Sequence, residues 1–342
     1  NYNIGIGFQA GYAVTTGIQN TLIGGLAGDA LTDADYNTAI GYAALSADTL
    51  GSRSVAIGRE ALNTQNFTSA TTVYNVGVGY AAGRAITTGV QNTLIGGLAG
   101  DALQDADRNV AIGYEALTTD DLGSRTVAIG VGAAGLQNYA SATNSHNICI
   151  GDLAGFYNVT GVKNTWLGSG AGIGASGQSN SNNTGIGYNA GLSVTTGVEN
   201  TLIGSLAGDA ITTGAANIII GFAAGGHATN LQTGDQNVLI GAYIDTTATD
   251  TDLANGIGYN ITAEGGYTTV GANTSDIRAA NGTATWAAVS DQRYKKDIAD
   301  STAGLSFINA LQPRTFKYKT LGELPETFSA YKADSTEVFK NS

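Results

Sequence analysis

The chain has 342 residues, of which 50 are Gly, 2 are Pro, 1 is Cys and none is Met, and its formal net charge is −12. No hydrophobic run approaches the ~20 residues that span a bilayer, so we expect no membrane insertion, and the acidic balance disfavours nucleic-acid binding. The single Cys149 excludes an internal disulfide framework and a multi-cysteine zinc site. With 42% apolar residues the chain can build a core, so we expect packing to stabilise it.

The ends of the chain differ in composition. It begins at Asn1 without an initiator Met, a basic leader or an apolar leader, so we expect a fragment of a longer protein. Residues 1–273 carry 6 basic and 19 acidic side chains, whereas residues 290–342 carry 8 basic and 7 acidic side chains and both prolines. This shift predicts two regions joined by a neck or linker over residues 274–289.

An internal repeat dominates residues 1–273. Sixteen coils share the pattern Asn, two variable residues, Ile, Gly, two variable residues and Ala, and a longer super-repeat is visible where residues 87–96 closely repeat residues 15–24. The anchor glycines of the coils are Gly7, Gly24, Gly41, Gly58, Gly79, Gly96, Gly113, Gly130, Gly151, Gly168, Gly187, Gly204, Gly221, Gly241, Gly258 and Gly271. Each coil, at about 17 residues, is too small to fold alone, so we predict one elongated parallel β-solenoid. The density of Gly, Val, Ile and Thr argues against the alternative of helical repeats.

Each column of the repeat predicts a role. Ile23 before the anchor Gly and Thr21 two positions earlier share one side of an expected strand, and we expect this side to face a narrow core. The residue between them, such as Leu22, is also mostly apolar, so the second side needs cover, for which another copy of the chain is the simplest candidate. We expect the Gly to permit a sharp turn, and stacked Asn side chains to satisfy turn backbone groups and one another.

The segments Asn37-Thr38-Ala39-Ile40-Gly41-Tyr42-Ala43-Ala44 and Ser54-Val55-Ala56-Ile57-Gly58-Arg59-Glu60-Ala61 resemble the YadA-like head repeats of trimeric autotransporter adhesins. That resemblance implies a parallel β-roll in which three chains surround one axis. It covers roughly residues 1–273. It is more specific for the architecture than for the biology, since viral fibres use similar rolls. Together with the uncovered side of the strands, it predicts a homotrimer.

A second resemblance begins where the composition changes. Residues Ser290-Asp291-Gln292-Arg293-Tyr294-Lys295-Lys296-Asp297-Ile298, with the segments 304–313 and 316–319, resemble the start of an S74-type intramolecular chaperone. That domain ends many phage tail fibres and spikes, drives their trimerisation and in many members cuts itself off with a Ser–Lys dyad. We therefore expect residues 290–342 to be the N-terminal part of such a chaperone. Tyr294 departs from the aliphatic residue common in the family.

The resemblance implies that Ser290 is the nucleophile, that Lys295 is its base, and that the bond cut joins Val289 to Ser290. A Ser hydroxyl needs an adjacent base, and a desolvated Lys can serve as one. The alternative interpretation is that the lysines form only a solvated charged loop with Asp291 and Asp297. If the dyad is functional, the enzymatic activity that we expect is at most a single cleavage of the chain by itself.

The last region also predicts local structure, as a small α+β segment. Asp300 and Ser301 precede an apolar-periodic stretch that ends before Pro313, which predicts a helix of about ten residues. Residues 314–319 then alternate as a strand.

From the remaining Asp, His and Cys residues of the sequence we expect neither a cofactor nor a metal site. The acidic pairs are Asp33/Asp35, Asp105/Asp107, Asp120/Asp121 and Asp250/Asp252, and carboxylates of this kind could bind Ca²⁺. Their spacing fits neither the EF-hand loop nor the Gly-Gly-x-Gly-x-Asp β-roll motif, so we interpret them as solvated loop carboxylates. His146 and His227 are far apart in sequence. Cys149 lies in a strand column otherwise held by Leu or Ala, so we interpret it as a small buried hydrophobic residue. Tyr side chains after several anchors are either exposed stacking surfaces for sugars or packing along the ladder.

These observations favour the distal shaft of a homotrimeric phage tail fibre, extracellular on the virion, which attaches to a host cell-surface receptor such as a glycan. The alternative is a bacterial trimeric surface adhesin on the cell surface, which explains the roll but not the motif at residues 290–319. A polysaccharide depolymerase would need a pair of carboxylates in a groove, and the sequence indicates none.

Overall fold

The computed structural model describes residues 2–283, 287–288, 319–324, 326–327 and 331–337. The chain divides into two units, Asn1–Ser290 and Asp291–Ser342. Unit 1 is built of short strands and turns, and the only regular element among the described residues of unit 2 is a short 3₁₀-helix. The predicted all-β solenoid, with one strand of the main sheet in each coil of the repeat, is therefore confirmed.

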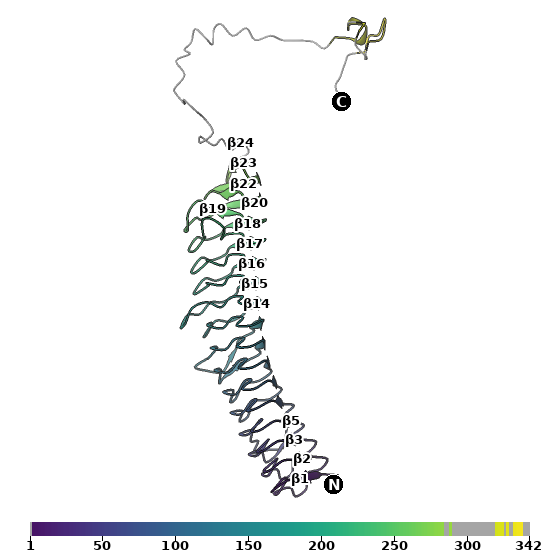
Figure 1. The fold of residues 1–342 in the computed structure, drawn as a ribbon, viewed down its shortest axis with the longest axis vertical. Coiled ribbons are helices and arrows are strands. Elements are labelled where there is room, and N and C mark those ends of the chain that lie inside the picture. The colour runs from purple at the N-terminus through teal and green to yellow at the C-terminus, as the bar shows by residue number, and fades with distance from the viewer. Residues whose placement is uncertain (1, 284–286, 289–318, 325, 328–330, 338–342) are drawn as a thin grey trace. The chain divides into compact units, whose positions relative to one another are not determined.

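Unit 1 rests on one long parallel sheet that receives one strand from each coil (Figure 1). Sixteen strands run parallel in chain order, one for each anchor glycine of the repeat. They are β1 (Ile4–Ile6), β2 (Thr21–Ile23), β3 (Thr38–Ile40), β5 (Val55–Ile57), β7 (Val76–Val78), β8 (Thr93–Ile95), β9 (Val110–Ile112), β11 (Val127–Ile129), β13 (Ile148–Ile150), β14 (Thr165–Leu167), β15 (Thr184–Ile186), β16 (Thr201–Ile203), β17 (Ile218–Ile220), β18 (Val238–Ile240), β20 (Asn255–Tyr259) and β22 (Tyr267–Ala272).

Successive strands pair so that equivalent positions of the repeat lie over one another. Ile23 on β2 lies between Ile6 on β1 and Ile40 on β3. The same register continues to the last parallel pair, where Ile257 on β20 faces Val270 on β22. The parallel solenoid expected from the repeat therefore stacks its coils in constant register.

The middle residue of each three-residue strand of the main sheet from β2 to β18 is buried inside the solenoid. Leu22 is 1% exposed, whereas Thr21 and Ile23 on either side of it remain partly exposed. The prediction that the Ile and Thr columns form the core is therefore wrong, and the two faces of the sheet are interchanged. The physical reason is room: a three-residue strand places one side chain on one face and two on the other, and the narrow coil encloses the single one. The core consists of the middle column, of the residue three positions after the anchor, which is usually Ala as in Ala27, and of aliphatic residues of the turns, such as Leu31 and Leu45.

Where the core contains a large side chain, the neighbouring coil has a small residue next to it. Trp166 occupies the middle of β14 and is fully buried. Its partner in the next coil is Gly185, and a Cβ there would overlap the indole ring. A side chain at Gly191 would also crowd the ring, at 3.0 Å from Cζ3. The interior of a coil is therefore close-packed, and a large side chain requires glycine above it.

The anchor glycines fix the turn that follows each strand. From Gly7 to Gly258 their φ angles lie between 130° and 150°, a region that L side chains rarely adopt. The turn also brings neighbouring coils together, because a Cβ on Gly96 would lie 2.7 Å from the carbonyl carbon of Gly113. The predicted role of the anchor in a sharp turn is confirmed, and the close approach of the next coil is a second requirement for glycine.

Three shorter ladders accompany the main sheet. The coils that end at Gly79 and Gly151 are longer than the usual coil, and their extra residues form short strands. The pairs are β4 (Gly51–Ser52) with β6 (Thr71–Thr72), β10 (Gly123–Ser124) with β12 (Thr143–Asn144), and β19 (Asp245–Thr246) with β21 (Thr262–Ala263). The first two pairs occupy equivalent places in successive copies of the super-repeat, which is therefore also a structural repeat.

Residues in the predicted neck continue the sheet with reversed direction. β23 (Ser275–Ala280) pairs antiparallel with β22, and β24 (Ala287–Ala288) pairs antiparallel with β23. The parallel ladder therefore ends in an antiparallel segment, since a chain that turns back directly on the last strand cannot pair parallel with it.

In unit 2, the 3₁₀-helix η2 (Leu321–Glu323) begins after Thr320. The backbone N–H of Thr320 donates to the Glu323 carboxylate at 2.8 Å, which closes the first turn. The helix predicted between Ser301 and Pro313 lies outside the described residues. The same holds for the strand predicted over residues 314–319, apart from Lys319.

Replacing an anchor glycine should destabilise the solenoid far more than replacing its neighbour. Gly96→Ala places a Cβ against the next coil at an unfavourable φ, and should lower the free energy of unfolding by about 2–4 kcal/mol. Gly97→Ala is the matched control, because its Cβ would lie 3.5 Å from Cδ2 of Tyr114, an ordinary contact. Chemical denaturation of both variants measures the difference. Equal stability of the two would contradict the role given to the anchor.

Candidate functional site

The predicted catalytic dyad falls outside the part of the chain that the structure describes. This holds for Ser290, for Lys295 and for the bond from Val289 to Ser290. The cleavage chemistry therefore stays a prediction. The described residues instead define a surface and two buried polar networks.

The outward side of the main sheet forms one surface of aliphatic and Thr side chains, which we call the ladder face. It consists of the first and third residues of each parallel strand from β2 to β18, and none of these residues is charged. Ile57 is 36% exposed and Leu167 is 41% exposed, whereas the middle residue of each of these strands is fully buried. The third-position residues are Ile23, Ile40, Ile57, Val78, Ile95, Ile112, Ile129, Ile150, Leu167, Ile186, Ile203, Ile220 and Ile240. The third-position column is therefore an unbroken row of aliphatic side chains, and a partly exposed row of this kind is typical of an interaction site.

A row of aromatic residues borders the ladder face. Tyr42, Tyr80, Tyr114, Tyr188 and Tyr259 each follow an anchor glycine and are 50–58% exposed. At two of these positions the previous coil has Gly under the ring, since a Cβ on Gly97 would contact Tyr114. These tyrosines therefore pack along the ladder and still present part of each ring to the surface.

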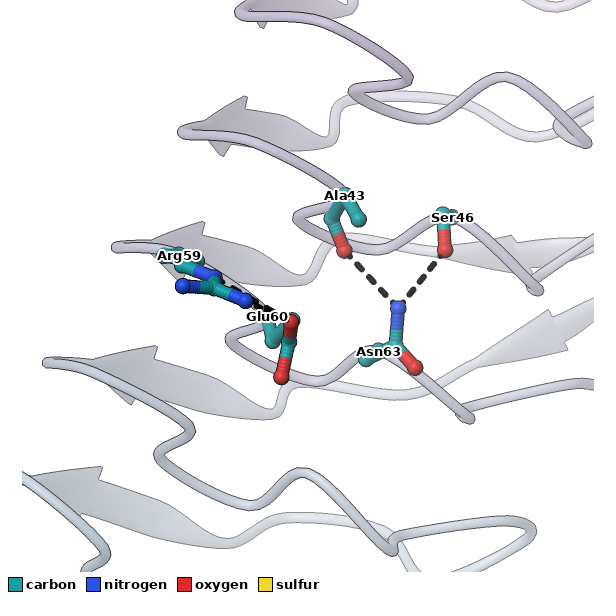
Figure 2. Close-up of polar contacts among 5 residues, drawn as sticks. All are labelled: Ala43, Ser46, Arg59, Glu60 and Asn63. Atoms are coloured by element: carbon teal, nitrogen blue, oxygen red, sulfur yellow. Dashed lines mark hydrogen bonds and ion pairs between the residues drawn. The ribbon is translucent and has the colours of Figure 1, made fainter.

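Polar side chains also join the turns of neighbouring coils. Figure 2 shows Asn63, whose Nδ2 donates to the Ala43 carbonyl at 3.1 Å and to the Ser46 hydroxyl at 2.8 Å. In the same coil Arg59 pairs with Glu60 at 3.0 Å. Such exposed pairs add little stability, but the bonds made by Asn63 hold adjacent coils in register.

The Asn of the repeat pattern forms a buried ladder inside the turns. Asn109 N donates to Asn92 Oδ1 at 2.9 Å, and Asn92 Nδ2 donates to the Ala106 carbonyl at 2.7 Å. The same bonds recur from coil to coil, with Asn200 and Asn217 as a further example. Each amide therefore satisfies a backbone donor and a backbone acceptor that the turn would otherwise leave unpaired. The predicted role of the stacked asparagines is confirmed.

At two of the four positions where the repeat lacks this Asn, Ser54 and Thr126, a buried acid and a glutamine take its place. Ser54 occupies the Asn position, and Gln65 Nε2 donates both to Ser54 Oγ at 3.0 Å and to Asp48 Oδ2 at 2.6 Å. Asp48 Oδ1 accepts from the backbone N–H of Gly51 and of Phe67, at 3.0 and 3.1 Å. This network therefore bridges the gap in the Asn ladder.

The second network repeats the first in the next copy of the super-repeat. Gln137 Nε2 donates to Asp120 Oδ2 at 2.7 Å and to Thr126 Oγ1 at 2.8 Å. Asp120 is fully buried, so the interpretation of this residue as a solvated loop carboxylate is wrong. Sequence reasoning missed both networks, although their recurrence within the super-repeat was a usable signal.

Burial raises the pKa of Asp48 and of Asp120 above the ordinary value of aspartic acid. In both, hydrogen bonds from the glutamine and from backbone N–H groups act in the opposite direction, because they favour the carboxylate. The solenoid therefore encloses two carboxyl groups that receive several hydrogen bonds but still lose hydration.

The remaining candidates have structural roles or none. Cys149 is 2% exposed in the core, and burial raises the pKa of its thiol to about 12, so its interpretation as a small buried hydrophobic residue is confirmed. Asp35 Oδ1 accepts from the Ile18 N–H at 2.8 Å. Within the described ranges, no three His, Cys, Asp or Glu side chains are grouped to hold a metal ion. The same part of the chain contains no helix of the length and apolarity that a bilayer crossing requires.

Comparison with known proteins gives one finding beyond the geometry. Residues 290–335 match the Peptidase_S74 family, described as the chaperone of endosialidase. The comparison found no match among curated proteins and none among solved structures. The predicted start of an S74-type chaperone at Ser290 is therefore confirmed, and its combination with the β-solenoid fits a protein of the phage tail-fibre type.

The buried acids should make the stability depend on pH in a defined direction. Because their pKa is raised from 3.8, the folded chain binds these protons more tightly than the unfolded chain does. Their contribution to the free energy of unfolding should therefore be highest at low pH and fall as the pH rises through the folded-state pKa. A variant with Asp48→Asn and Asp120→Asn has no carboxyl groups at these two positions, so its free energy of unfolding should fall less as the pH rises.

The difference in unfolding free energy, variant minus wild type, should therefore increase between about pH 4 and pH 7. For each unit by which burial raises one pKa, the increase is about 1.4 kcal/mol. Guanidinium unfolding monitored by circular dichroism at several pH values measures it. A difference that stays constant over this range would show that the two carboxyl groups do not titrate differently on folding.

Proposed function

We propose that the chain is the distal shaft of a homotrimeric phage tail fibre that serves host attachment, assembled by a C-terminal chaperone. The observation that carries the proposal is the match of residues 290–335 to the chaperone of endosialidase, directly after a solenoid. On this proposal the protein is extracellular, as part of the virion, and its receptor is a molecule of the host cell surface.

The ladder face supports the homotrimer. It carries two apolar or Thr side chains per coil, and its third-position column stays partly exposed in the single chain. Isolated chains would leave this row of Ile and Val in water, whereas identical chains that pack by this face would bury it along the whole shaft. From the sequence we expect another copy of the chain to cover the side of the strands that the coil does not enclose. We keep that proposal, but the covered side is the one with Ile and Thr and not the one with the middle residues.

A bacterial trimeric surface adhesin is the second candidate. The YadA-like repeat and the apolar face suit it equally well. The chaperone match at residues 290–335 favours the tail fibre, because it belongs to a domain that the adhesin alternative leaves unexplained.

Charges on the ladder face should weaken the trimer. In a variant with Ile95→Lys and Ile112→Lys, assembly would bury two unpaired ammonium groups per chain, at a cost of at least several kcal/mol. The wild type should show a trimer mass by light scattering, and the variant a lower mass or a lower dissociation temperature. Thr88→Lys is the control, since Thr88 is exposed and its hydroxyl already contacts Asp105 at 2.8 Å. Equal assembly of all three proteins would contradict the proposed interface.

Self-cleavage is a separate proposal that concerns the chaperone. In the protein expressed from the complete gene, assembly would desolvate Lys295, which would take the proton of the Ser290 hydroxyl as this oxygen attacks the Val289 carbonyl. The peptide bond from Val289 to Ser290 would break as the Ser290 nitrogen leaves with a proton, and water would hydrolyse the ester formed on Ser290. Ser290→Ala and Lys295→Ala should each abolish release of a C-terminal piece, and both together should cost no more than either alone. Lys296→Ala is the control and should still release it.

N-terminal sequencing of the released piece identifies the bond. A piece that begins at Ser290 supports the dyad. Release from the Ser290→Ala protein would place the nucleophile elsewhere. No release from the wild type would mean that the chaperone assembles the fibre without cutting it.

A further inference from the structure

Near the end of the parallel ladder, four rings form a cluster on the surface of the solenoid, which we call the aromatic platform. It consists of Phe222, Tyr243, Tyr259 and His227. Tyr243 lies at the centre, with ring centroids 5.3 Å from Phe222, 5.9 Å from Tyr259 and 4.7 Å from His227, all in edge-to-face geometry. Phe222 is 45% exposed and Tyr259 is 50% exposed, so the cluster is open to solvent.

The repeat does not require this cluster. Earlier in the solenoid, no two successive coils carry an aromatic residue directly after the anchor, and two of the rings, Tyr42 and Tyr114, follow coils with Gly there. A ring is wider than the ~4.8 Å between strands, so a residue without an aromatic ring intervenes in the regular stack. Here three successive coils each contribute a ring, which is possible because Tyr243 stands one position later in its coil than Phe222 and Tyr259 do. The cluster is therefore a local departure from the repeat.

The histidine is held in place by a buried carboxylate. The coil between Gly221 and Gly241 is longer than the usual coil, and His227 lies in its enlarged turn. Asp245 Oδ1 accepts from the backbone N–H groups of residues 227, 228 and 229, at 3.1, 2.8 and 3.3 Å. Its Oδ2 lies 3.6 Å from His227 Nδ1. One acid therefore fixes both the turn and the ring against Tyr243.

The surroundings add polar groups and lack basic ones. Asn260, directly after Tyr259, donates through Nδ2 to Asn273 Oδ1 at 2.9 Å on the exposed surface. No Lys or Arg occurs between Lys163 and Arg278. A ligand at this place therefore meets ring faces and edges, an imidazole and amides, and no cationic side chain of this stretch to pair with a carboxylate or phosphate.

We propose that the aromatic platform binds a neutral hexopyranose unit of a cell-surface polysaccharide. The C–H face of a pyranose ring stacks on exposed aromatic rings, and its hydroxyl groups suit imidazole and amide partners. The absence of nearby basic side chains disfavours sialic and uronic acids. This inference rests on the proposed host attachment, for which it names the receptor class and the site.

Saturation-transfer NMR on the assembled protein tests the proposal. The probes are the methyl glycosides of glucose, galactose, mannose and N-acetylglucosamine at millimolar concentration, with methyl glucuronate and methyl sialoside as charged comparisons. At least one neutral glycoside should receive saturation at its ring protons, and the charged ones should bind more weakly. Phe222→Ala with Tyr259→Ala should weaken binding at least about tenfold.

Tyr114→Ala is the matched control. Tyr114 has the same place in its coil and a similar exposure of 53%, but it belongs to no cluster of paired rings in the described part of the chain. This variant should bind sugar as the wild type does. If Tyr114→Ala lost binding equally, or if no neutral glycoside bound the wild type, the platform would not be a sugar site.

Light scattering of the same samples separates this proposal from the proposed trimer. A trimer that binds none of the neutral glycosides overturns the sugar site and leaves the fibre proposal intact. Loss of the trimer in the Phe222→Ala, Tyr259→Ala protein, but not in Tyr114→Ala, would show that the rings serve the interface between copies and would also overturn the sugar site.

Discussion

The close approach of one anchor glycine to the next is the constraint on which the solenoid depends. A strand can follow its predecessor in register only if the chain turns sharply after each strand and the turns of adjacent coils nearly touch. Gly96 does both, because its φ is 137° and a Cβ on it would overlap the backbone of Gly113. The anchor Gly thus lets adjacent coils approach to the distance at which their strands pair, and equivalent residues then stay in register.

Satisfaction of the turn backbone is the second requirement, and protein side chains meet it. In most coils one Asn side chain accepts from the next coil and donates to a turn carbonyl, as Asn92 does. Where Ser54 or Thr126 replaces Asn, a glutamine reaches across from the longer coil and a buried aspartate orients it. The solenoid retains its register there, but two carboxyl groups lose hydration, which is why the two networks are expected to respond to pH.

The narrow interior of the solenoid determines which side chains lie on its outer surface. Since each coil encloses only the middle residue of its strand, Ile and Thr are turned outward and make the ladder face. The rows beside that face are then available for other contacts, and the aromatic platform is the place where they depart from the repeat. Assembly and recognition can therefore use adjacent surfaces of one shaft, with neither depending on a pocket in the core.

The sequence by itself determined the β-solenoid, its register, the glycine turns, the Asn ladder and the start of the chaperone at Ser290. The features of the solenoid follow from local geometry repeated many times, so periodicity reveals them. The periodicity also predicted that Cys149 is buried, because residues at the same position of successive coils lie in similar surroundings.

Only the tertiary structure decided which face of the strands is inside. Ile23 and Leu22 are both apolar, and because side chains alternate along a strand they point to opposite faces of the sheet. This alternation does not show which of the two faces lies inside the coil. The space within a coil decides it, and that space depends on the path of the whole coil. The structure likewise decided that Asp120 is buried and that Phe222, Tyr243 and Tyr259 meet, because these contacts join residues of successive coils, whose proximity depends on how coils of unequal length stack.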